Sequence, residues 1–251
     1  MKNYKMVIAY DGTRYDGWQK QGNTEKTIQG KLELILEKMV GQPVEVHGSG
    51  RTDAGVHSKG QVANFHIDTK LSCEEIKNYL NMYLPKDIGV LSVTEVPERF
   101  HSRLHAVGKT YEYRIITSKV PHVFERNYVY FYEKPLDVYA MRQASLSLIG
   151  EHDFLGFCSL KKMKKSSIRT ITSIEIEEIQ MQGVQDEIRI TVTGNGFLYN
   201  MVRIIVGTLI EIGAGNKKSE DIETILKTKN RQLAGMTAPA SGLSLKEVYY
   251  E

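Results

Sequence analysis

The chain has 251 residues, of which 41% are hydrophobic and 25% are charged, and its formal net charge is +3. This composition suits a globular protein of one or two domains, and the mildly basic balance does not by itself demand a nucleic-acid partner. The two cysteines lack zinc-site or CxxC spacing, so neither a metal site nor a disulfide is indicated, and a reducing cytoplasm is expected. The longest apolar stretch, residues 201–212, is interrupted by charges and is too short to cross a bilayer, which excludes a membrane span.

Hydrophobic periodicity in the first half of the chain predicts the order β-α-β-β-α-β. Residues 27–40 and 72–84 place apolar side chains at helical spacing, and the second stretch opens with Ser72 and Glu75 as a capping box. Short apolar or alternating runs predict the strands, which are residues 5–10, 44–49, 61–67 and 88–96. This order is that of the ferredoxin-like split βαβ fold.

The second half repeats this order of elements without a close sequence repeat. Its predicted strands are residues 109–117, 171–179, 188–193 and 243–249. Its predicted helices are residues 138–149, capped by Asp137, then 197–213 and 219–227. The helix at 197–213 is apolar nearly all round, so it should be largely buried.

These elements predict an α+β fold of two ferredoxin-like halves, residues 1–106 and 107–251. Two open sheets of this type can join edge to edge, because each then hides one edge strand. The expected result is one largely antiparallel sheet with helices on one face. A single shared core is the alternative arrangement.

The most informative stretch is residues 50–57, Gly-Arg-Thr-Asp-Ala-Gly-Val-His, between two predicted strands. Gly48, Gly50 and Gly55 can adopt positive φ, so the loop can hold a side chain where regular structure cannot. Asp53 is then a single carboxylate on a rigid platform, and Arg51 is the nearest cation in the sequence. The alternative is an ordinary hairpin turn in which Asp53 caps its own backbone.

Positive charge is concentrated in two segments. Residues 159–170 carry Lys161, Lys162, Lys164, Lys165 and Arg169 without an acid. Residues 99–114 carry arginines, lysine and histidines against one acid, Glu112. Each segment alone could be a solvated face, but together they favour a polyanionic partner.

The loop at 50–57 resembles the active-site signature of the tRNA pseudouridine synthase A (TruA) family. Further blocks similar to this family run in order over nearly the whole chain. They are Tyr-Asp-Gly at 10–12, Gly-Trp-Gln-Lys-Gln at 17–21, Phe-His-Ser-Arg at 100–103, Lys-Thr-Tyr-Glu-Tyr-Arg at 109–114, His-Asp-Phe at 152–154, Arg-Thr-Ile at 169–171, Phe-Leu-Tyr-Asn-Met-Val-Arg at 197–203 and Thr-Ala-Pro-Ala-Ser-Gly-Leu at 237–243. One such block would be weak, but the ordered set is specific.

The resemblance implies an isomerase that converts uridine to pseudouridine at positions 38, 39 and 40 of the tRNA anticodon stem-loop. It implies a homodimer, two halves of the fold around a basic RNA-binding cleft, and no metal, organic cofactor or membrane. Asp53 is the implied catalytic residue, Arg203 is implied to lie beside it, and Tyr111 is implied to stack on the flipped base. The predicted substrate-binding residues are therefore Tyr111, Arg51 and Arg203.

A lone carboxylate agrees with this chemistry, which breaks the N1–C1′ bond of uridine and joins C5 to C1′. Asp53 could attack C1′ as a nucleophile or remove the C2′ proton toward a glycal. Because the base is kept, no second carboxylate is needed to activate water. Asp53 must stay ionised, which a nearby arginine favours.

The residues alone leave other interpretations open. Arg203 could form a structural ion pair or reach the surface, and Tyr111 could pack in the core as Tyr113 is expected to do. His57 could anchor its loop or contact RNA. The chain could also be a non-catalytic RNA-binding protein of two RRM-type sheets, although the required aromatic spacing is missing. A phosphate-binding enzyme built on residues 48–50 ranks last, because this stretch is not GxGxxG and precedes no helix.

Overall fold

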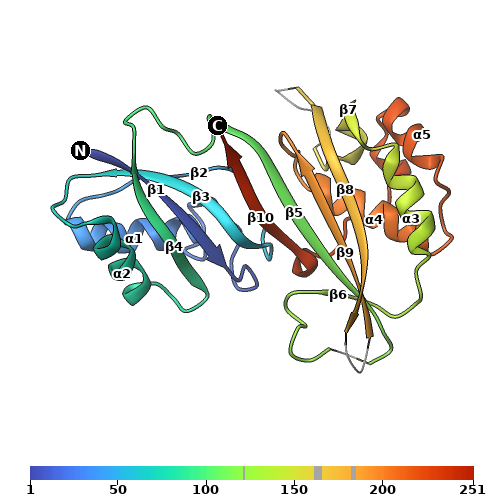
Figure 1. Cartoon of the computed structure of the whole chain (residues 1–251), viewed down its shortest axis with the longest axis horizontal. Helices are drawn as coiled ribbons and strands as arrows, with labels where there is room; N and C mark the ends of the chain where they lie inside the picture. The colour runs from blue at the N-terminus through green and yellow to red at the C-terminus, as the bar shows by residue number, and fades with distance from the viewer. Residues whose placement is uncertain (121, 161–165, 182–184) are drawn as a thin grey trace. The chain divides into compact units, whose positions relative to one another are not determined.

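The structure is a computed structural model that describes residues 1–120, 122–160, 166–181 and 185–251. The lysine run at 161–165, which the sequence predicts to contact a polyanion, lies outside the described residues. The chain divides into two compact units (Figure 1). The first comprises Met1–Val107 with Ser244–Glu251, and the second comprises Gly108–Leu243. The sequence predicts halves at 1–106 and 107–251, so the structure differs from this expectation in the last strand.

The strands of the first unit are β1 (Lys2–Tyr10), β2 (Val46–Gly48), β3 (His57–Ile67), β4 (Ile88–Val96) and β10 (Leu243–Tyr250). β1 pairs antiparallel with β3 and with β4, and β2 pairs antiparallel with β3. β10 pairs in parallel with the start of β3, where Ser244 lies opposite His57. The strands predicted for this half are thus confirmed, with β3 beginning four residues earlier than residue 61.

Two close contacts explain why β10 belongs to the first unit. The Ser58 hydroxyl donates to the Leu245 carbonyl oxygen at 3.1 Å. An added Cβ at Gly60 would lie 2.7 Å from the Lys246 carbonyl oxygen, so only glycine allows this approach. Hydrophobic periodicity predicts that a strand exists but not which strand it pairs with. For this reason the sequence predicts residues 243–249 as part of the second half.

The helices of the first unit are α1 (Ile28–Val40) and α2 (Cys73–Tyr83) (Figure 1). The Thr27 side chain caps α1 by accepting from the Gly30 amide, and α1 ends at Gly41 with φ of 74°. The predicted capping box of Ser72 and Glu75 is present at the start of α2.

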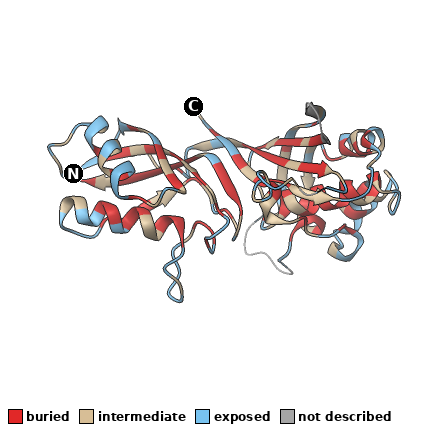
Figure 2. Ribbon diagram, turned by 90° about the horizontal axis from the view of Figure 1, so that it is seen from below, coloured by how far each residue is buried: buried red, intermediate tan, exposed pale blue. Residues whose placement is uncertain are grey.

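Alternate side chains of β1 face the core beneath these helices. Tyr4, Met6, Ile8 and Tyr10 are at most 5% exposed and pack in one apolar cluster with side chains of both helices. Figure 2 shows the buried positions in red along the strands and the inner helix faces. Burying one such side chain stabilises the fold by about 1.5–3 kcal/mol, so the period-two pattern fixes the register of the sheet.

The strands of the second unit are β5 (Ala106–Thr117), β6 (Tyr130–Tyr132), β7 (Gly150–Asp153), β8 (Ile168–Met181) and β9 (Gln185–Gly194). β9 pairs antiparallel with β5 and β8, β7 pairs antiparallel with β8, and β6 pairs in parallel with β5. The sequence predicts β5, β8 and β9 but not β6 and β7. Both missed strands are too short to show a period of two.

The helices of the second unit are α3 (Val138–Leu146), α4 (Met201–Gly213) and α5 (Asp221–Thr228), together with the 3-10 turns η1 (Phe154–Phe157), η2 (Arg231–Leu233) and η3 (Ala240–Gly242). Asp137 caps α3 as predicted, accepting from the Ala140 amide. α4 is buried along nearly its whole length, which confirms the expectation from its apolar sequence.

Among the described residues, the fold is therefore mixed α+β, with mostly antiparallel strands and five α-helices. None of the helices within the described ranges is long and apolar enough to cross a membrane. Cys73 and Cys158 are both free thiols.

Candidate active site

The Asp53 loop, residues 49–56, connects β2 to β3 in the first unit. Its turn is closed by a hydrogen bond of 3.1 Å from the Val56 amide to the Asp53 carbonyl oxygen, and Gly55 has φ of 77°. Gly48 and Gly50 do not have positive φ, contrary to the expectation for them. Gly48 is required for a different reason, because an added Cβ would lie 2.5 Å from the Trp18 ring. Asp53 itself is half-buried.

A second loop, residues 11–19, packs against the Asp53 loop. The Trp18 amide donates to the Thr52 carbonyl oxygen at 3.0 Å, and the Gly55 amide donates to the Tyr15 carbonyl oxygen at 3.2 Å. Gly17 has φ of 96°, and an added Cβ would lie 2.7 Å from the same Thr52 oxygen. Asp53 is thus flanked on both sides by backbone contacts to a second segment of chain.

Buried polar side chains hold the Asp53 loop from the core side. The Tyr10 and Thr52 hydroxyls lie 2.8 Å apart, and burial raises the pKa of Tyr10 to about 12. Gln61 accepts from the Ser49 hydroxyl at 2.6 Å and donates to the Gly50 carbonyl oxygen at 3.1 Å. These contacts favour a rigid platform over a hairpin turn that caps only its own backbone.

His57 is an anchor of the two loops. It is 3% exposed, its Nδ1 accepts from the Gly12 amide at 3.0 Å, and the same nitrogen lies 3.2 Å from Asp11 Oδ1. An RNA contact by this ring would require exposure that it does not have. Trp18 is likewise buried, at 2% exposure, which agrees with packing rather than stacking on RNA.

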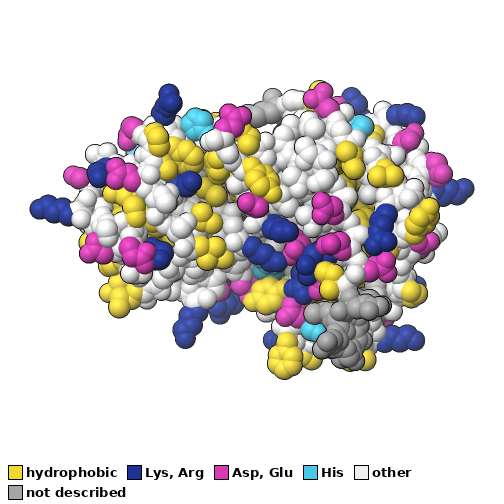
Figure 3. All heavy atoms as spheres, in the orientation of Figure 1, with side chains coloured by type: hydrophobic (Ala, Val, Ile, Leu, Met, Phe, Trp, Pro, Cys, Tyr) yellow, Lys and Arg dark blue, Asp and Glu magenta, His cyan; other side chains and the backbone are white. Residues whose placement is uncertain are grey.

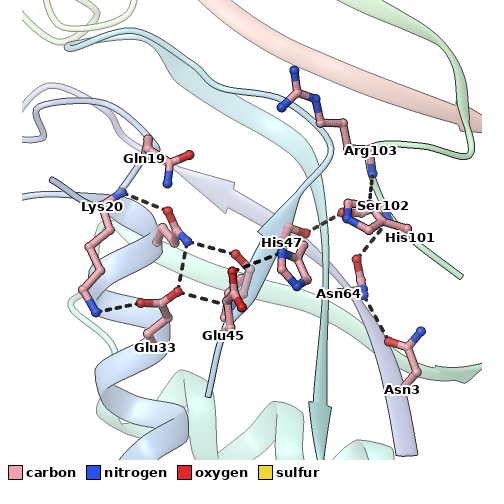
Figure 4. A network of polar contacts seen from close by, with 12 residues as sticks. Asn3, Gln19, Lys20, Glu33, Glu45, His47, Asn64, His101, Ser102 and Arg103 are labelled. Atoms are coloured by element: carbon pink, nitrogen blue, oxygen red, sulfur yellow. Dashed lines mark hydrogen bonds and ion pairs between the residues drawn. The ribbon is translucent and has the colours of Figure 1, made fainter. Parts of the chain in front are cut away.

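Arg51 and β2 connect the Asp53 loop to α1. The exposed Arg51 side chain donates from Nε to Gln19 Oε1 at 3.0 Å. Lys20, which follows Gln19 at the end of the second loop, pairs with Glu33 of α1 at 3.0 Å. Glu33 also accepts from the Val46 amide of β2 at 3.2 Å (Figure 4). The strand that leads into the Asp53 loop is therefore fixed to a helix by a buried carboxylate.

Tyr111 and Tyr113 lie on β5 in the second unit, on the same face of the strand. Tyr113 is fully buried and donates from its hydroxyl to the Pro239 carbonyl oxygen at 2.8 Å, and burial raises its pKa. Tyr111 is also buried, at 8% exposure, and packs edge-on against Phe197 with ring centroids 5.2 Å apart, as the core-packing alternative for this residue expects. Core packing of Tyr113 agrees with the sequence expectation.

Arg203 is half-buried on α4. Its Nε donates to the Ala238 carbonyl oxygen at 2.7 Å, and its Nη1 donates to Asn200 Oδ1 at 3.0 Å. Asn200 sits at the N-terminus of α4 with φ of 61°. Neutral oxygens thus fix the direction of this guanidinium within the second unit.

One cation of the basic segment at residues 99–114 is less available than the sequence suggests. Arg114 pairs with Glu187 of β9 at 2.7 Å and with Glu125 at 2.8 Å, and these partners raise its pKa. Counting charges along one segment cannot reveal a carboxylate on the neighbouring strand. Over the face shown in Figure 3, positive and negative side chains are interspersed.

Comparison with known proteins identifies the chain's relatives. The sequence profile of a family described as tRNA pseudouridine synthase matches residues 6–104 and 144–251. The chain belongs to the tRNA pseudouridine synthase family. tRNA pseudouridine synthase A of Bacillus sp. (strain KSM-64) is 52% identical over 250 residues, covering 100% of both chains. tRNA pseudouridine synthase A 2 of Bacillus cereus (strain ZK / E33L) is 46% identical over 250 residues, and that of Clostridium perfringens (strain 13 / Type A) is 46% identical over 252 residues, each with 100% coverage of both chains.

As a tRNA pseudouridine synthase, the protein is an isomerase that converts uridine to pseudouridine in tRNA. The residues predicted to act in this reaction are distributed between the units. Asp53 and Arg51 belong to the first, and Tyr111 and Arg203 belong to the second. Among the described residues of this tRNA pseudouridine synthase, no group of His, Cys, Asp and Glu side chains is arranged to hold a metal ion.

Sequence reasoning missed the residues that support these side chains in the synthase. Thr52 lies in the stretch at 50–57 and Gln61 begins the predicted strand at 61–67. Both are polar residues, however, and a polar residue type alone does not show that the side chain is buried. The burial of Tyr10 could have been predicted, because Tyr10 ends an apolar strand and lies two residues after Ile8, on the same face as the core side chains of that strand. The contact of Arg203 with Ala238 joins positions 35 residues apart and leaves no local pattern.

Proposed function

We propose that this enzyme isomerises uridines 38, 39 and 40 of the tRNA anticodon stem-loop, and that Asp53 is its catalytic residue. The observation that carries the proposal is the construction of the Asp53 loop. Buried Tyr10, Thr52 and Gln61 and the second loop at 11–19 hold in one place the backbone of the loop that carries the half-buried Asp53. A reaction at a sugar carbon needs a carboxylate fixed close to productive geometry, because small misplacements cost large factors in rate.

The chemistry assigned to Asp53 has two routes. In the first, the ionised carboxylate attacks C1′ as the N1–C1′ bond breaks, and the turned uracil then displaces it through C5. In the second, Asp53 removes the C2′ proton as the base leaves, which forms a C1′=C2′ double bond, and returns the proton to C2′ as C5 bonds to C1′. In either route C5 then loses its proton and N1 gains one. Both routes retain the uracil within the site, so neither needs a water-activating base.

The other predicted residues take supporting roles in this proposal. Tyr111 supplies an aromatic face for the flipped uracil, and Arg203 and Arg51 contact the substrate and favour the ionised form of Asp53. Support comes from the family match and from the fixed directions of these side chains within their own units. Arg203 is held by Ala238, and Arg51 by Gln19.

The two units are proposed to be ferredoxin-like halves that together present an RNA-binding cleft. For the first unit, the support is its element order β1-α1-β2-β3-α2-β4 and the pairing of β1 between β3 and β4. We further propose a cytoplasmic homodimer. Its size in solution, measured by light scattering with and without tRNA, tests the dimer.

The test of catalysis is tritium release from tRNA labelled at C5 of uridine. Asp53→Asn keeps the size and much of the hydrogen bonding of the side chain but removes its charge, so turnover should be abolished while tRNA is still bound. Asp16→Asn is the matched control, because Asp16 is an exposed acid of the neighbouring loop, and it should retain turnover. Appreciable turnover by Asp53→Asn would refute the assignment. Mapping pseudouridine in tRNA from cells that lack this gene tests positions 38, 39 and 40.

A further inference from the structure

The motif at residues 100–103 has no role in the proposed chemistry, yet it builds a distinct cluster in the first unit. The His101 ring stacks on the His47 ring of β2, with centroids 5.1 Å apart and planes at 27°. His105 stacks on Phe100 at 5.9 Å, and the Arg103 side chain is exposed. His47, His101, Arg103 and His105 are called the histidine cluster below. Figure 4 shows the His47 and His101 side chains near each other, with Arg103 on the same loop as His101 and its guanidinium directed away from the two rings.

The loop that carries the histidine cluster is fixed to the sheet by buried polar groups. The Ser102 hydroxyl donates to the His47 carbonyl oxygen at 2.5 Å, and the Ser102 amide donates to Asn64 Oδ1 at 2.9 Å. Asn3 Nδ2 donates to the Phe100 carbonyl oxygen at 2.8 Å, and Asn64 Nδ2 donates to Asn3 Oδ1 at 3.2 Å (Figure 4). Ser102, Asn3 and Asn64 are each at most 1% exposed. Ligand-binding side chains on such a loop keep their directions without a partner, which lowers the entropic cost of binding.

Two backbone amides set the tautomers of the cluster. His101 Nδ1 accepts from the Arg103 amide at 3.1 Å, and His105 Nδ1 accepts from the His101 amide at 2.9 Å. A ring nitrogen that accepts a hydrogen bond carries no proton, so the proton of each neutral ring is on Nε2. Both rings therefore offer an Nε2–H donor whether or not they are charged. A further proton has to go to Nδ1 and displaces the backbone amide that donates to it, so the charged ring needs an anion to compensate for this lost hydrogen bond.

The charges around His101 disfavour a further proton while no anion is present. Its pKa is lowered first by burial and then by His47, His105 and Arg103. On the neighbouring elements, the exposed Glu45 carboxylate lies 3.7 Å from His47 Nδ1, and Lys5 Nζ lies 5.9 Å from the Phe100 ring centre. Positive or potentially positive groups thus outnumber the single carboxylate near His47. An anion placed among them would offset the repulsion from these positive groups and so raise the pKa of His101, although its burial would remain.

We propose that the histidine cluster binds a backbone phosphate of tRNA and takes up a proton when it does so. The inference rests on tRNA as the proposed substrate but not on the role assigned to Asp53. A phosphodiester offers acceptor oxygens to the Nε2–H donors and to the Arg103 guanidinium, and its charge stabilises an imidazolium. Inorganic phosphate shares this chemistry, and the experiment below separates the two sources.

Proton uptake makes the affinity for tRNA depend on pH in a defined direction. The phosphate raises the pKa of the ring in the complex above its value in the free protein. Affinity therefore increases as the pH falls through the pKa of the complex, and it levels off below the pKa of the free ring. A rise of one pKa unit on binding corresponds to about a tenfold gain in affinity.

The experiment is fluorescence anisotropy of labelled tRNA with the full chain between about pH 8 and pH 6, the range in which histidine titrates. His101→Gln keeps a neutral donor near the position of Nε2 but cannot gain a proton. It should bind like the wild type at the higher pH and lose the gain in affinity, about tenfold per unit of pKa shift, at the lower pH. His101→Asn keeps an acceptor near Nδ1 for the Arg103 amide but loses the distal donor, so it should bind more weakly at both pH values.

His66→Gln is the matched control. His66 is a partly exposed histidine of the same sheet, but its Nε2 lies 3.3 Å from Glu98 Oε1, which disfavours a phosphate. This variant should keep the wild-type pH dependence. Added inorganic phosphate at constant ionic strength should weaken tRNA binding by the wild type more than by His101→Gln at the lower pH. Equal weakening of the two would show that free phosphate does not occupy this site.

The proposal is overturned if a folded His101→Gln protein, with an unchanged melting temperature, keeps the full pH dependence. It is also overturned if His66→Gln loses that dependence equally. Asp53→Asn should bind tRNA with the wild-type pH dependence, which separates this inference from the catalytic assignment. If the wild-type protein does not prefer tRNA to an unrelated RNA, the proposed substrate fails as well.

Discussion

The hydroxyl of Tyr10, the last residue of β1, lies 2.8 Å from the hydroxyl of Thr52, the residue before Asp53. Both side chains are buried, at 5% and 6% exposure. Because burial raises the pKa of Tyr10 to about 12, its hydroxyl keeps its proton over the whole range in which the enzyme can work. This pair of hydroxyls thus connects the core of the first unit to the residue next to Asp53, in addition to the contacts of Gln61 with the start of the loop.

Tyr10→Phe should lower turnover more than it lowers tRNA affinity. The substitution keeps the ring in the core but leaves the Thr52 hydroxyl with one partner fewer, which costs about 1 kcal/mol of unfolding free energy. The loop should then sample more positions, so kcat should fall while the dissociation constant for tRNA stays within about twofold of the wild type, equivalent to less than 0.5 kcal/mol. Single-turnover kinetics with saturating enzyme measures this difference.

Two substitutions at Thr52 provide the control for this prediction. Thr52→Ser keeps the hydroxyl and should restore most of the wild-type rate, whereas Thr52→Val keeps the shape and should behave like Tyr10→Phe. If Thr52→Val turns over tRNA at the wild-type rate, the hydroxyl pair does not position the loop.

Gly17→Ala should lower the stability and the turnover of the enzyme by more than the strain of a positive φ alone would cause. Gly17 and Gly41 both have positive φ, but only at Gly17 would the added Cβ meet an atom, the Thr52 carbonyl oxygen at 2.7 Å. Strain from φ costs about 1 kcal/mol for a non-glycine residue, so Gly41→Ala measures this component. Thermal unfolding and tritium release should both show a larger loss for Gly17→Ala. Equal losses in the two variants would contradict the close approach of the loops.

Most of the elements were predictable from the sequence because their signals are local. The apolar period of α1, the capping box at Ser72 and the alternation along β1 each depend on neighbours within one or two turns of chain. The short strands β6 and β7 carry no such signal, and their existence depends on pairing with β5 and β8. The partner of β10 was unpredictable for the same reason.

The candidate site was predictable only as a list of chemical groups. The resemblance to a family supplied Asp53, Arg51, Tyr111 and Arg203, and the family itself is confirmed by the comparisons. The contacts that hold the loops of the first unit join residues that are far apart in the sequence. Ser102 fixes the His47 backbone across 55 residues, and Tyr10 reaches Thr52 across 42. Such contacts follow from the fold and have no counterpart in composition or spacing.

Glu187→Gln should destabilise the second unit strongly at neutral pH. The Glu187 side chain is 1% exposed and accepts from both Nε and Nη2 of Arg114, at 3.0 and 2.7 Å. Among the described residues, the amide leaves the Arg114 guanidinium with Glu125 as its other carboxylate partner, and it also removes the charge that pairs with Arg189 at 3.0 Å. Breaking a buried pair in this way costs about 3 kcal/mol, which urea unfolding would measure.

The same pair predicts how stability depends on pH. Burial alone would raise the pKa of Glu187, but the hydrogen bonds and charges of Arg114 and, to a smaller extent, Arg189 outweigh it and hold the pKa below 4.5. The contribution is therefore complete above about pH 4.5 and is lost as the pH falls through the lower, folded-state pKa. The unfolding free energies of the wild type and Glu187→Gln should converge in that range. Glu178→Gln is the control, because the Glu178–Arg142 pair is exposed and should contribute less than about 0.5 kcal/mol.

Tyr111 and Tyr113 lie on the same face of β5, so their position on the strand does not show which of them contacts the substrate. Substituting each by alanine should distinguish the proposed substrate contact from the packing residue. Tyr113 is fully buried and its hydroxyl is bonded to Pro239. Tyr113→Ala should therefore lower the melting temperature sharply, since removing a buried aromatic side chain costs about 3–5 kcal/mol. Tyr111 is buried less completely, at 8% exposure, so Tyr111→Ala should lower the melting temperature by a smaller amount and should also reduce turnover measured below that temperature.

Tyr111→Phe and Tyr111→Ala together report what the ring and the hydroxyl do. Stacking of a base on an aromatic ring is worth about 1–3 kcal/mol, so Tyr111→Ala should lose about a tenfold to hundredfold factor in kcat/KM. If the ring alone matters, Tyr111→Phe should be nearly as active as the wild type. If the hydroxyl assists removal of the C5 proton, Tyr111→Phe should be slow as well and should show a deuterium isotope effect at C5. Wild-type kinetics in a folded Tyr111→Ala protein would mean that the uracil stacks on another side chain.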